Sequence, residues 1–458
     1  MDRRTTVVNF RIQTARPLLY TLLVASFIIQ TLTGLQWVQF IEGILALICF
    51  FISIRDARGM FQIAAIVFIT AGIACMIWGQ IPLSQLPLLM TSNVMLISLL
   101  YMLPFINRVI RVGGYDRHLS RWLHVKSGNL GNLYVRSLAV SYLLSLFLFF
   151  AALPLLHRVL SKHLQHQEQE LKNRFLGISI LRGFGIVALW SPVEPLVATA
   201  VVLTGVSYMS LLPWMFGLSL VLLAAGSLWG LSFRHVTLAT TQGTEPKAPS
   251  WSKTITFLFA LVLLITIAFG LQAVMQISFF AAMTFLLLPF SLIWAITLRR
   301  FNRYIGSIRL HGKESIDGLR HLLVLFLSFG FFNSAVTQSP LFHLVEGYVQ
   351  AIAHFPALLL ICIFLACFLL PVAGIHPLVV MGLIGFMLQP ILAIMNPLSI
   401  AIVLISSCLS ASFMGTFNTT VTIMSGLLRV NPFRITIWNF GYGLVFGGIG
   451  VIVGLLLL

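Results

Sequence analysis

The chain has 458 residues, of which 59% are hydrophobic and only 9% are charged, and its mean hydropathy is +1.01. This composition excludes an ordinary soluble domain and indicates a protein with many membrane spans. The net charge of +17 does not indicate nucleic-acid binding, because the lysines and arginines fall in short clusters between apolar runs. We therefore expect a lipid bilayer, and no nucleic acid, among its partners.

The first part of the chain contains four apolar runs, each long enough to cross a membrane as a helix. They cover residues 17–35, 37–54, 60–79 and 87–107. Basic clusters lie before the first run, between the second and third, and after the fourth, so we expect a cytoplasmic N-terminus. Residues 1–86 contain one acid within a span, Glu42, and are predicted to form a scaffold. Glu42 is either a helix contact or a proton-coupling group.

The next apolar run, 136–157, ends in a second basic segment at 158–174, although a single crossing should have led outside. The sidedness is restored if residues 120–163 form a re-entrant hairpin that enters from the cytoplasm and turns near 149–154. Such backbone is tolerated at membrane depth only where it is buried in protein or lines a cavity.

The second half of the chain repeats this pattern with the opposite orientation. Further spans are predicted at 176–206, 211–231, 254–271, 275–298, 321–337, 397–428 and 435–458. Residues 338–390 contain no Lys or Arg, which predicts a second hairpin that enters from outside and turns near 371–377. Arg429 and Arg434 then lie inside, so the C-terminus is expected outside. The predicted class is an all-α polytopic membrane protein with about 11 transmembrane helices and two re-entrant hairpins.

Each hairpin is followed by a long helix with an interruption. In "SPVEP", Pro192 and Pro195 remove amide donors, and in "GTFNTT", Gly415 and the Thr/Asn cluster supply a weak point. Two such units of opposite topology are typical of an inverted-repeat secondary transporter. The predicted boundaries are 87–232 for repeat 1, 233–253 for a cytoplasmic linker and 254–458 for repeat 2.

Candidate substrate- or ion-binding residues lie at these interruptions and at the second hairpin turn. They are Ser191, Glu194, Thr199, Gly374, His376, Gly415, Thr416, Asn418 and Thr419. An intramembrane acid such as Glu194 is a functional candidate, and the alternative is a cap on a half-helix. Each of the other candidates has an alternative interpretation. The hydroxyls are hydrogen-bonded to their own backbone, the polar run is a surface for helix packing, and His376 is a buried neutral side chain.

The order of these segments resembles the ion transporter superfamily, which includes divalent anion/sodium symporters, arsenite permeases, sodium/proton antiporters and the large subunits of TRAP-type transporters. The likeness covers residues 88–231 and 319–458. It rests on "LLYMLPFINRVIRVGGYDRHLSRWL", "LWSPVEPLVATAV", "LLVLFLSFGFFNSAVTQSPLFHLVEGY" and "NPLSIA" before a Gly-Thr-x-Asn break. The resemblance implies a scaffold, a mobile transport domain with elevator-like alternating access, and commonly a homodimer. Neither hairpin turn carries the Ser-Asn-Thr signature of several branches, so their carboxylate or sodium binding is not carried over.

The predicted function is a secondary active transporter that moves a small, anionic or polar solute across the cytoplasmic membrane, coupled to a gradient of Na⁺ or H⁺. One alternative is a non-transporting assembly or accessory protein on a transporter fold. The other is a membrane-embedded glycan or lipid enzyme, but no HxxxxD, HExxH or GxSxG arrangement is present, so we expect no enzyme. The five cysteines lie in apolar runs without metal-ligand spacing, so we expect no metal and no cofactor.

Overall fold

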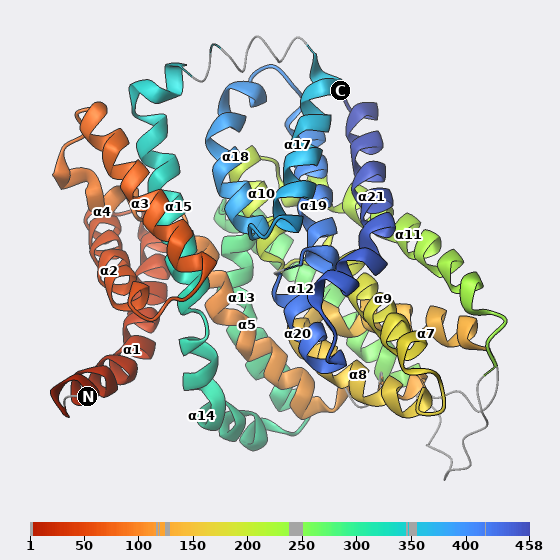
Figure 1. Cartoon of the computed structure of the whole chain (residues 1–458). Helices are drawn as coiled ribbons and strands as arrows, with labels where there is room; N and C mark the ends of the chain where they lie inside the picture. Colours follow the sequence, from red (N-terminus) through yellow and green to blue (C-terminus); the bar gives the residue numbers. More distant parts are fainter. Residues whose placement is uncertain are drawn as a thin grey trace. The chain divides into compact units, whose positions relative to one another are not determined.

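The protein is described by a computed structural model that covers residues 3–115, 118, 120–123, 129–237, 251–344, 347, 355–416 and 418–458. These residues form helices joined by turns and contain no strand, and one isolated backbone bridge joins Asn129 and Thr237 (Figure 1). The predicted all-helical class is therefore confirmed. Most of the predicted linker, 233–253, lies outside the described residues.

Ten helical stretches of the described chain are long and apolar enough to cross a membrane. They are Arg16–Thr33, Gln36–Ile54, Met60–Trp78, Leu83–Gly113, Tyr208–Phe233, Trp251–Met275, Phe279–Thr297, Ser315–Thr337, Pro397–Leu428 and Pro432–Leu456. Each coincides with one of the eleven predicted spans. The remaining predicted span, 176–206, is divided into two shorter helices.

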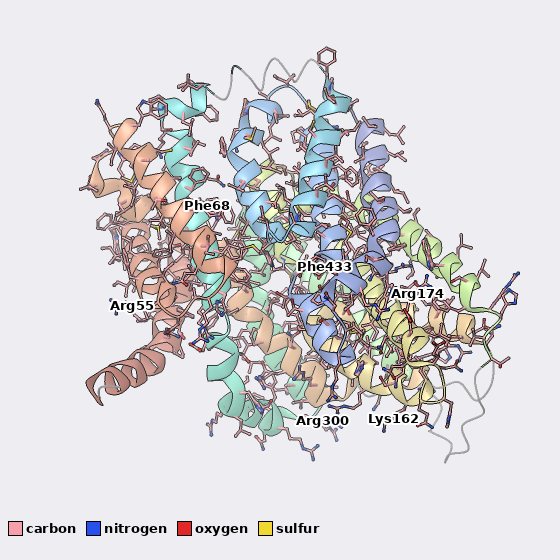
Figure 2. The ribbon with its side chains drawn as sticks, viewed as in Figure 1. Arg55, Phe68, Lys162, Arg174, Arg300 and Phe433 are labelled. Atoms are coloured by element: carbon pink, nitrogen blue, oxygen red, sulfur yellow. The ribbon has the colours of Figure 1, made fainter. Side chains whose placement is uncertain are left out.

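Packing divides the chain into two compact units. Unit 1 comprises Met1–Val109, Ile267–His354 and Gly382–Ala393. Its helices are α1 (Arg3–Thr33), α2 (Gln36–Ile54), α3 (Met60–Trp78), α4 (Leu86–Leu89), most of α5 (Val94–Gly113), α13 (Phe279–Thr297), α14 (Phe301–Asp317) and α15 (Arg320–Thr337). Helix α15 packs along α3, where Phe68, labelled in Figure 2, lies 5.4 Å from Phe332 between ring centroids. This grouping by packing does not test the predicted repeat boundaries, which stay a prediction.

A buried ion-pair network holds one end of unit 1 together. Arg16 of α1 is only 1% exposed, and its guanidinium pairs with Asp56, after α2, and with Asp317, at the end of α14, at 2.9 Å. Arg320 of α15 pairs with the same Asp317 at 2.5 Å. A buried guanidinium is costly unless its charge is matched, so these carboxylates fix α1 against α14 and the α2–α3 turn.

Glu42 is a buried acid in α2, and the described residues supply no hydrogen bond or ion pair to its carboxyl group. The adjacent Gly43 lies so close to the carbonyl oxygen of Pro87 in α4 that a side chain would collide with it. This surface of α2 is therefore a helix–helix contact.

We expect Glu42→Gln, which keeps the side-chain volume, to leave solute flux in proteoliposomes mostly intact. Complete loss of flux with normal membrane expression would contradict the scaffold assignment.

Unit 2 comprises Ile110–Thr266, Phe355–Met381 and Ile394–Leu458. Its helices are α7 (Leu130–Leu148), α8 (Ala152–His163), α9 (Gln169–Ala188), α10 (Pro195–Thr204), α11 (Tyr208–Trp229), α17 (Pro356–Val372), α19 (Pro397–Met414), α20 (Thr419–Leu428) and α21 (Pro432–Leu456). Helices α12 (Trp251–Met275) and α18 (Pro377–Leu392) contribute residues to both units. Every predicted site residue belongs to unit 2.

The centre of unit 2 is α19, whose residues from Ser399 to Met414 are all buried. Helix α21 packs along it through a row of glycines at helical spacing: Gly443, Gly447, Gly450 and Gly454. A Cβ atom on any of them would collide with α19 or α17; at Gly450 the obstacle is Ser406 of α19. Small residues let these helix backbones approach closely, so α19 and α21 form a tightly packed pair.

Candidate functional site

Unit 2 contains two broken helices built on the same plan. Helix α9 ends at Ala188, and the chain leaves helical geometry over residues 189–194, the first break, before α10 begins at Pro195. Pro192 and Pro195 cannot donate to a helical ladder, and each forces the residue before it away from helical dihedral angles. Glu194 accordingly has φ −78° and ψ 121°. The predicted interruption of this helix is therefore present in the structure.

The second broken helix has no proline at its break. Helix α19 ends at Met414, the second break occupies 415–418, with 417 outside the described part, and α20 follows. Gly415 is not needed for an unusual φ, since its value is −63°. It is needed for space, because a Cβ there would lie 2.7 Å from the carbonyl oxygen of Ala411. Close packing against the preceding turn of α19 therefore gives a structural reason for glycine at this position.

The second halves of the two helices correspond closely. Helices α10 and α20 each have 10 residues, each starts with a polar cap, and each ends at a left-handed residue, Gly205 or Arg429. Helix α10 packs against α19, and α20 packs against α9. The second half of each broken helix therefore contacts the first half of the other.

Each predicted hairpin turn falls where expected and lies beside a broken helix. Helices α7 and α8 meet at Phe149–Ala151, and Phe150 stacks on Phe184 of α9 with ring centroids 5.8 Å apart. Helix α17 ends at Val372, and the carbonyl oxygen of Pro371 lies 3.4 Å from the position of a Cβ on Gly415. The second turn is thus next to the second break.

The polar groups of the first break are buried. Glu194 caps α10, since its carboxyl oxygen accepts from the amide of Leu196 at 3.5 Å. The hydroxyl of Ser191 has no hydrogen-bond partner among the described residues. Thr199 donates its hydroxyl to the carbonyl oxygen of Pro195 at 2.7 Å, within its own helix. The break therefore offers one carboxyl group and one unused hydroxyl, whereas Thr199 is satisfied locally.

At the second break the polar groups bind one another. Asn418 caps α20, and its side-chain oxygen accepts from the amide of Thr420 at 3.3 Å. The hydroxyl of Thr416 lies 3.1 Å from that of Thr436 on α21, and Thr419 is half-buried. The hydroxyl of Thr420 donates to the carbonyl oxygen of Ser412 across the break. Thr420 therefore belongs to the polar groups of the second break. Its position in the polar run is the only sequence feature that could have predicted this.

The two candidates at the second hairpin turn have evident structural roles. Gly374 has φ 112°, a region that residues with a side chain rarely adopt. The Nδ1 atom of His376 accepts from the amide of Leu378 at 3.2 Å, which caps the start of α18. Within the described part of the chain, no group of three His, Cys, Asp or Glu side chains could hold a metal ion.

The breaks give unit 2 a defined electrostatic pattern. A helix that starts inside a protein leaves its first amides pointing out of its N-terminus, and that end attracts negative charge. The carbonyl groups at the end of the preceding half-helix attract cations. Helices α10 and α20 present such amides, and α9 and α19 present such carbonyls. The starts of α10 and α20 therefore carry partial positive charge, and the ends of α9 and α19 carry partial negative charge.

A buried guanidinium, which the sequence analysis counts only as a charge, lies on α9. Arg182 is fully buried and donates to the side-chain oxygen of Asn439 and to the carbonyl oxygen of Trp438, both at 3.1 Å. Its guanidinium carbon also lies 4.6 Å and 4.5 Å from the ring centroids of Trp229 and Tyr442. Arg182 thus joins α9 to α11 and α21 through cation–π contacts and hydrogen bonds.

Comparison with known proteins supports a transporter fold. No family model matches the chain, and no curated protein matches it. The structure is similar to the crystal structure of the Alcanivorax borkumensis YdaH transporter, which is described as having an unusual topology. The TM-score is 0.61 at 14% sequence identity, and the match covers 86% of this chain and 97% of that one. The likeness shows a multi-span membrane fold that a transporter shares, and the resemblance to the ion transporter superfamily stays a prediction.

Proposed function

We propose that this protein is a secondary active transporter that moves a small anionic or polar solute across the cell membrane by alternating access. The observation that carries the proposal is the pair of crossed broken helices, α9–α10 and α19–α20. Such breaks place the ends of helices, with their partial charges, inside the membrane, where a solute and a coupling ion can bind them. The fold likeness to a transporter agrees with this function.

In the proposed mechanism, the amides at the starts of α10 and α20 attract the anionic group of the solute. Asn418, Thr416 and Ser191 supply polar contacts around it, while Glu194 carries the coupling proton or helps to bind Na⁺. Unit 2, which contains every candidate residue, is the mobile transport domain, and the two hairpin turns act as gates. A homodimer through unit 1 would supply the fixed frame.

The direct test is flux through the purified chain in proteoliposomes under an imposed Na⁺ or pH gradient. The solutes should include dicarboxylates, inorganic anions and neutral polar metabolites, with protein-free vesicles as the baseline. We expect uptake of an anionic or polar solute that depends on one of the two gradients. Absence of flux for all of them would favour the second candidate, a non-transporting protein on the same fold. The apolar turn at Phe149 and Phe150 is the observation that favours this candidate.

Glu194→Gln tests the role of the carboxyl group separately from binding of the solute. Glutamine keeps the size of the side chain and can still accept from the Leu196 amide, so the cap of α10 is preserved. It cannot carry a proton or a negative charge. We expect the dependence of flux on pH or Na⁺ to be altered while the protein still folds. An unchanged dependence on both would assign Glu194 to capping alone.

A further inference from the structure

An arginine-rich turn lies between two candidate spans of unit 1. Helix α13 ends at Thr297 and α14 begins at Phe301, so Arg299 and Arg300 occupy the turn, and Arg303 lies in the first turn of α14. The flanking spans, Phe279–Thr297 and Ser315–Thr337, enter and leave on the same side of the membrane. The turn and α14 therefore lie at a membrane–water interface, whichever side that is.

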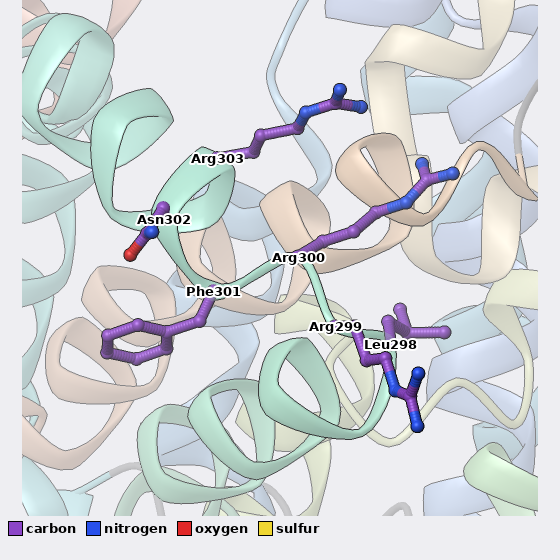
Figure 3. Close-up of a pocket in the computed structure, with 6 residues that line it drawn as sticks. All are labelled: Leu298, Arg299, Arg300, Phe301, Asn302 and Arg303. Carbon is purple, nitrogen blue, oxygen red and sulfur yellow. The ribbon is translucent and has the colours of Figure 1, made fainter.

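The turn borders an open surface cavity of about 480 Å³ that is lined by Leu298, Arg299, Arg300, Phe301, Asn302 and Arg303. Arg299 has a left-handed backbone, with φ 54°, and the amide of Arg300 reaches back to the carbonyl oxygen of Ala295 at 3.0 Å. This sharp reversal sends the side chain of Arg299 to one side, whereas Arg300 and Arg303 extend together to the other (Figure 3). The guanidinium groups thus line different sides of the cavity.

The local field favours an anion. The first turn of α14 contains no acidic residue, and the start of a helix adds partial positive charge to that of the arginines. Arg299 and Arg303 are exposed. A guanidinium presents two parallel N–H groups that match the oxygens of a phosphate, which is why arginine is common where phosphate is bound.

Helix α14 is also positioned to meet lipid. It is amphipathic, and Phe301 at its start is 40% exposed, in the same run as the exposed basic residues Arg299 and Arg303. Arg108 of α5 donates to Ser307 and Ser315 of α14 at 3.0 and 3.1 Å, so the helix is held against the unit. A basic amphipathic helix at a membrane surface places its apolar side chains at the boundary between headgroups and acyl chains.

We propose that Arg299, Arg300 and Arg303 form a binding site for the phosphate group of an anionic membrane lipid, with Phe301 beside the start of its acyl chains. The juxtaposition of a guanidinium-lined cavity with exposed apolar side chains favours a lipid over a free anion. This site belongs to unit 1, contains none of the candidate residues of unit 2, and does not depend on the proposed transport function.

Lipid retention by the purified full-length chain tests the proposal without a transport assay. Native mass spectrometry would compare phosphatidylglycerol with phosphatidylcholine, and inorganic phosphate would be the competitor. We expect preferential retention of phosphatidylglycerol that millimolar phosphate does not displace. Arg303→Gln should weaken it about fivefold, the effect of one basic residue near an anionic surface, and Arg303→Lys should weaken it less.

Two further variants keep the result interpretable. Arg299→Asn removes the charge while tolerating the left-handed backbone, so it should also weaken retention in a chain that folds normally. Arg309→Gln removes an exposed charge from the same helix but outside the cavity, so it should weaken retention clearly less than Arg303→Gln does. Equal losses in Arg309→Gln and Arg303→Gln would overturn the proposal in favour of general surface charge. Full competition by inorganic phosphate would assign the site to a small anion, and equal retention of both lipids would also overturn the proposal.

Discussion

Solute flux through Asn418→Leu is expected to fall to the level of protein-free vesicles, while the variant still inserts and elutes as a folded protein. Asn418 is 8% exposed and lies at the second break, where its side-chain oxygen caps α20. Leucine removes the amide group and adds apolar volume at the point where the transport proposal places the solute. The lost cap alone costs about 1 kcal/mol, which is small compared with the stability of a large membrane unit.

Asn418→Asp and Asn418→Ser are the matched controls, because both side chains can still cap α20. If the amide contacts the solute, both variants should fold as well as wild type but transport more slowly. If capping is the whole role of Asn418, both should transport normally, and only the leucine variant should lose stability. Normal flux in Asn418→Leu would contradict any solute contact at this break.

Arg182→Lys is expected to lower the free energy of unfolding by about 3–5 kcal/mol, although the charge is kept. Lysine has a shorter side chain that ends in one compact ammonium group. This group cannot donate at once to the side-chain oxygen of Asn439, the carbonyl oxygen of Trp438 and the hydroxyl of Tyr134, which lies 3.3 Å from the guanidinium. The planar contacts with Trp229 and Tyr442 are lost as well. Thermal unfolding of the purified protein in detergent, followed by circular dichroism, measures the effect.

Arg174→Lys is the control for this prediction, since Arg174 lies on the same helix but is exposed (Figure 2). Its substitution should change the free energy of unfolding by no more than about 0.5 kcal/mol. Equal midpoints for Arg182→Lys and wild type would show that the guanidinium does not bind α21 as described here.

The sequence predicts the spans and breaks well because their signals are local. Apolar runs mark ten spans directly, and the prolines of "SPVEP" prevent a helix whatever surrounds them. The turns near Phe149 and Gly374 were predicted from the sidedness of charge, and the structure has turns there. The orientation of the termini and the re-entrant nature of the hairpins stay predictions.

The partners of the site residues could not be predicted, because they depend on distant parts of the chain. Thr199 and His376 look like ligands in the sequence, yet each has a hydrogen bond that serves its own segment. Arg182 carries no sequence signal beyond its charge, since two of its three acceptors are more than 250 residues away along the chain. The need for glycine at 415 likewise follows from the packing of the second break and not from the local sequence.

The contacts of Arg182 also impose an order on biosynthesis. Helix α9 leaves the ribosome long before α21, so of the three acceptors of the Arg182 guanidinium only Tyr134 has been made by then. An arginine near the centre of a helix opposes membrane insertion by about 2.5–3.5 kcal/mol on translocon scales. Helix α9 is not among the stretches apolar enough to span alone. We therefore expect α9 to reach its final packing only after α21 has been synthesised, because two of the three acceptors of Arg182 lie on α21.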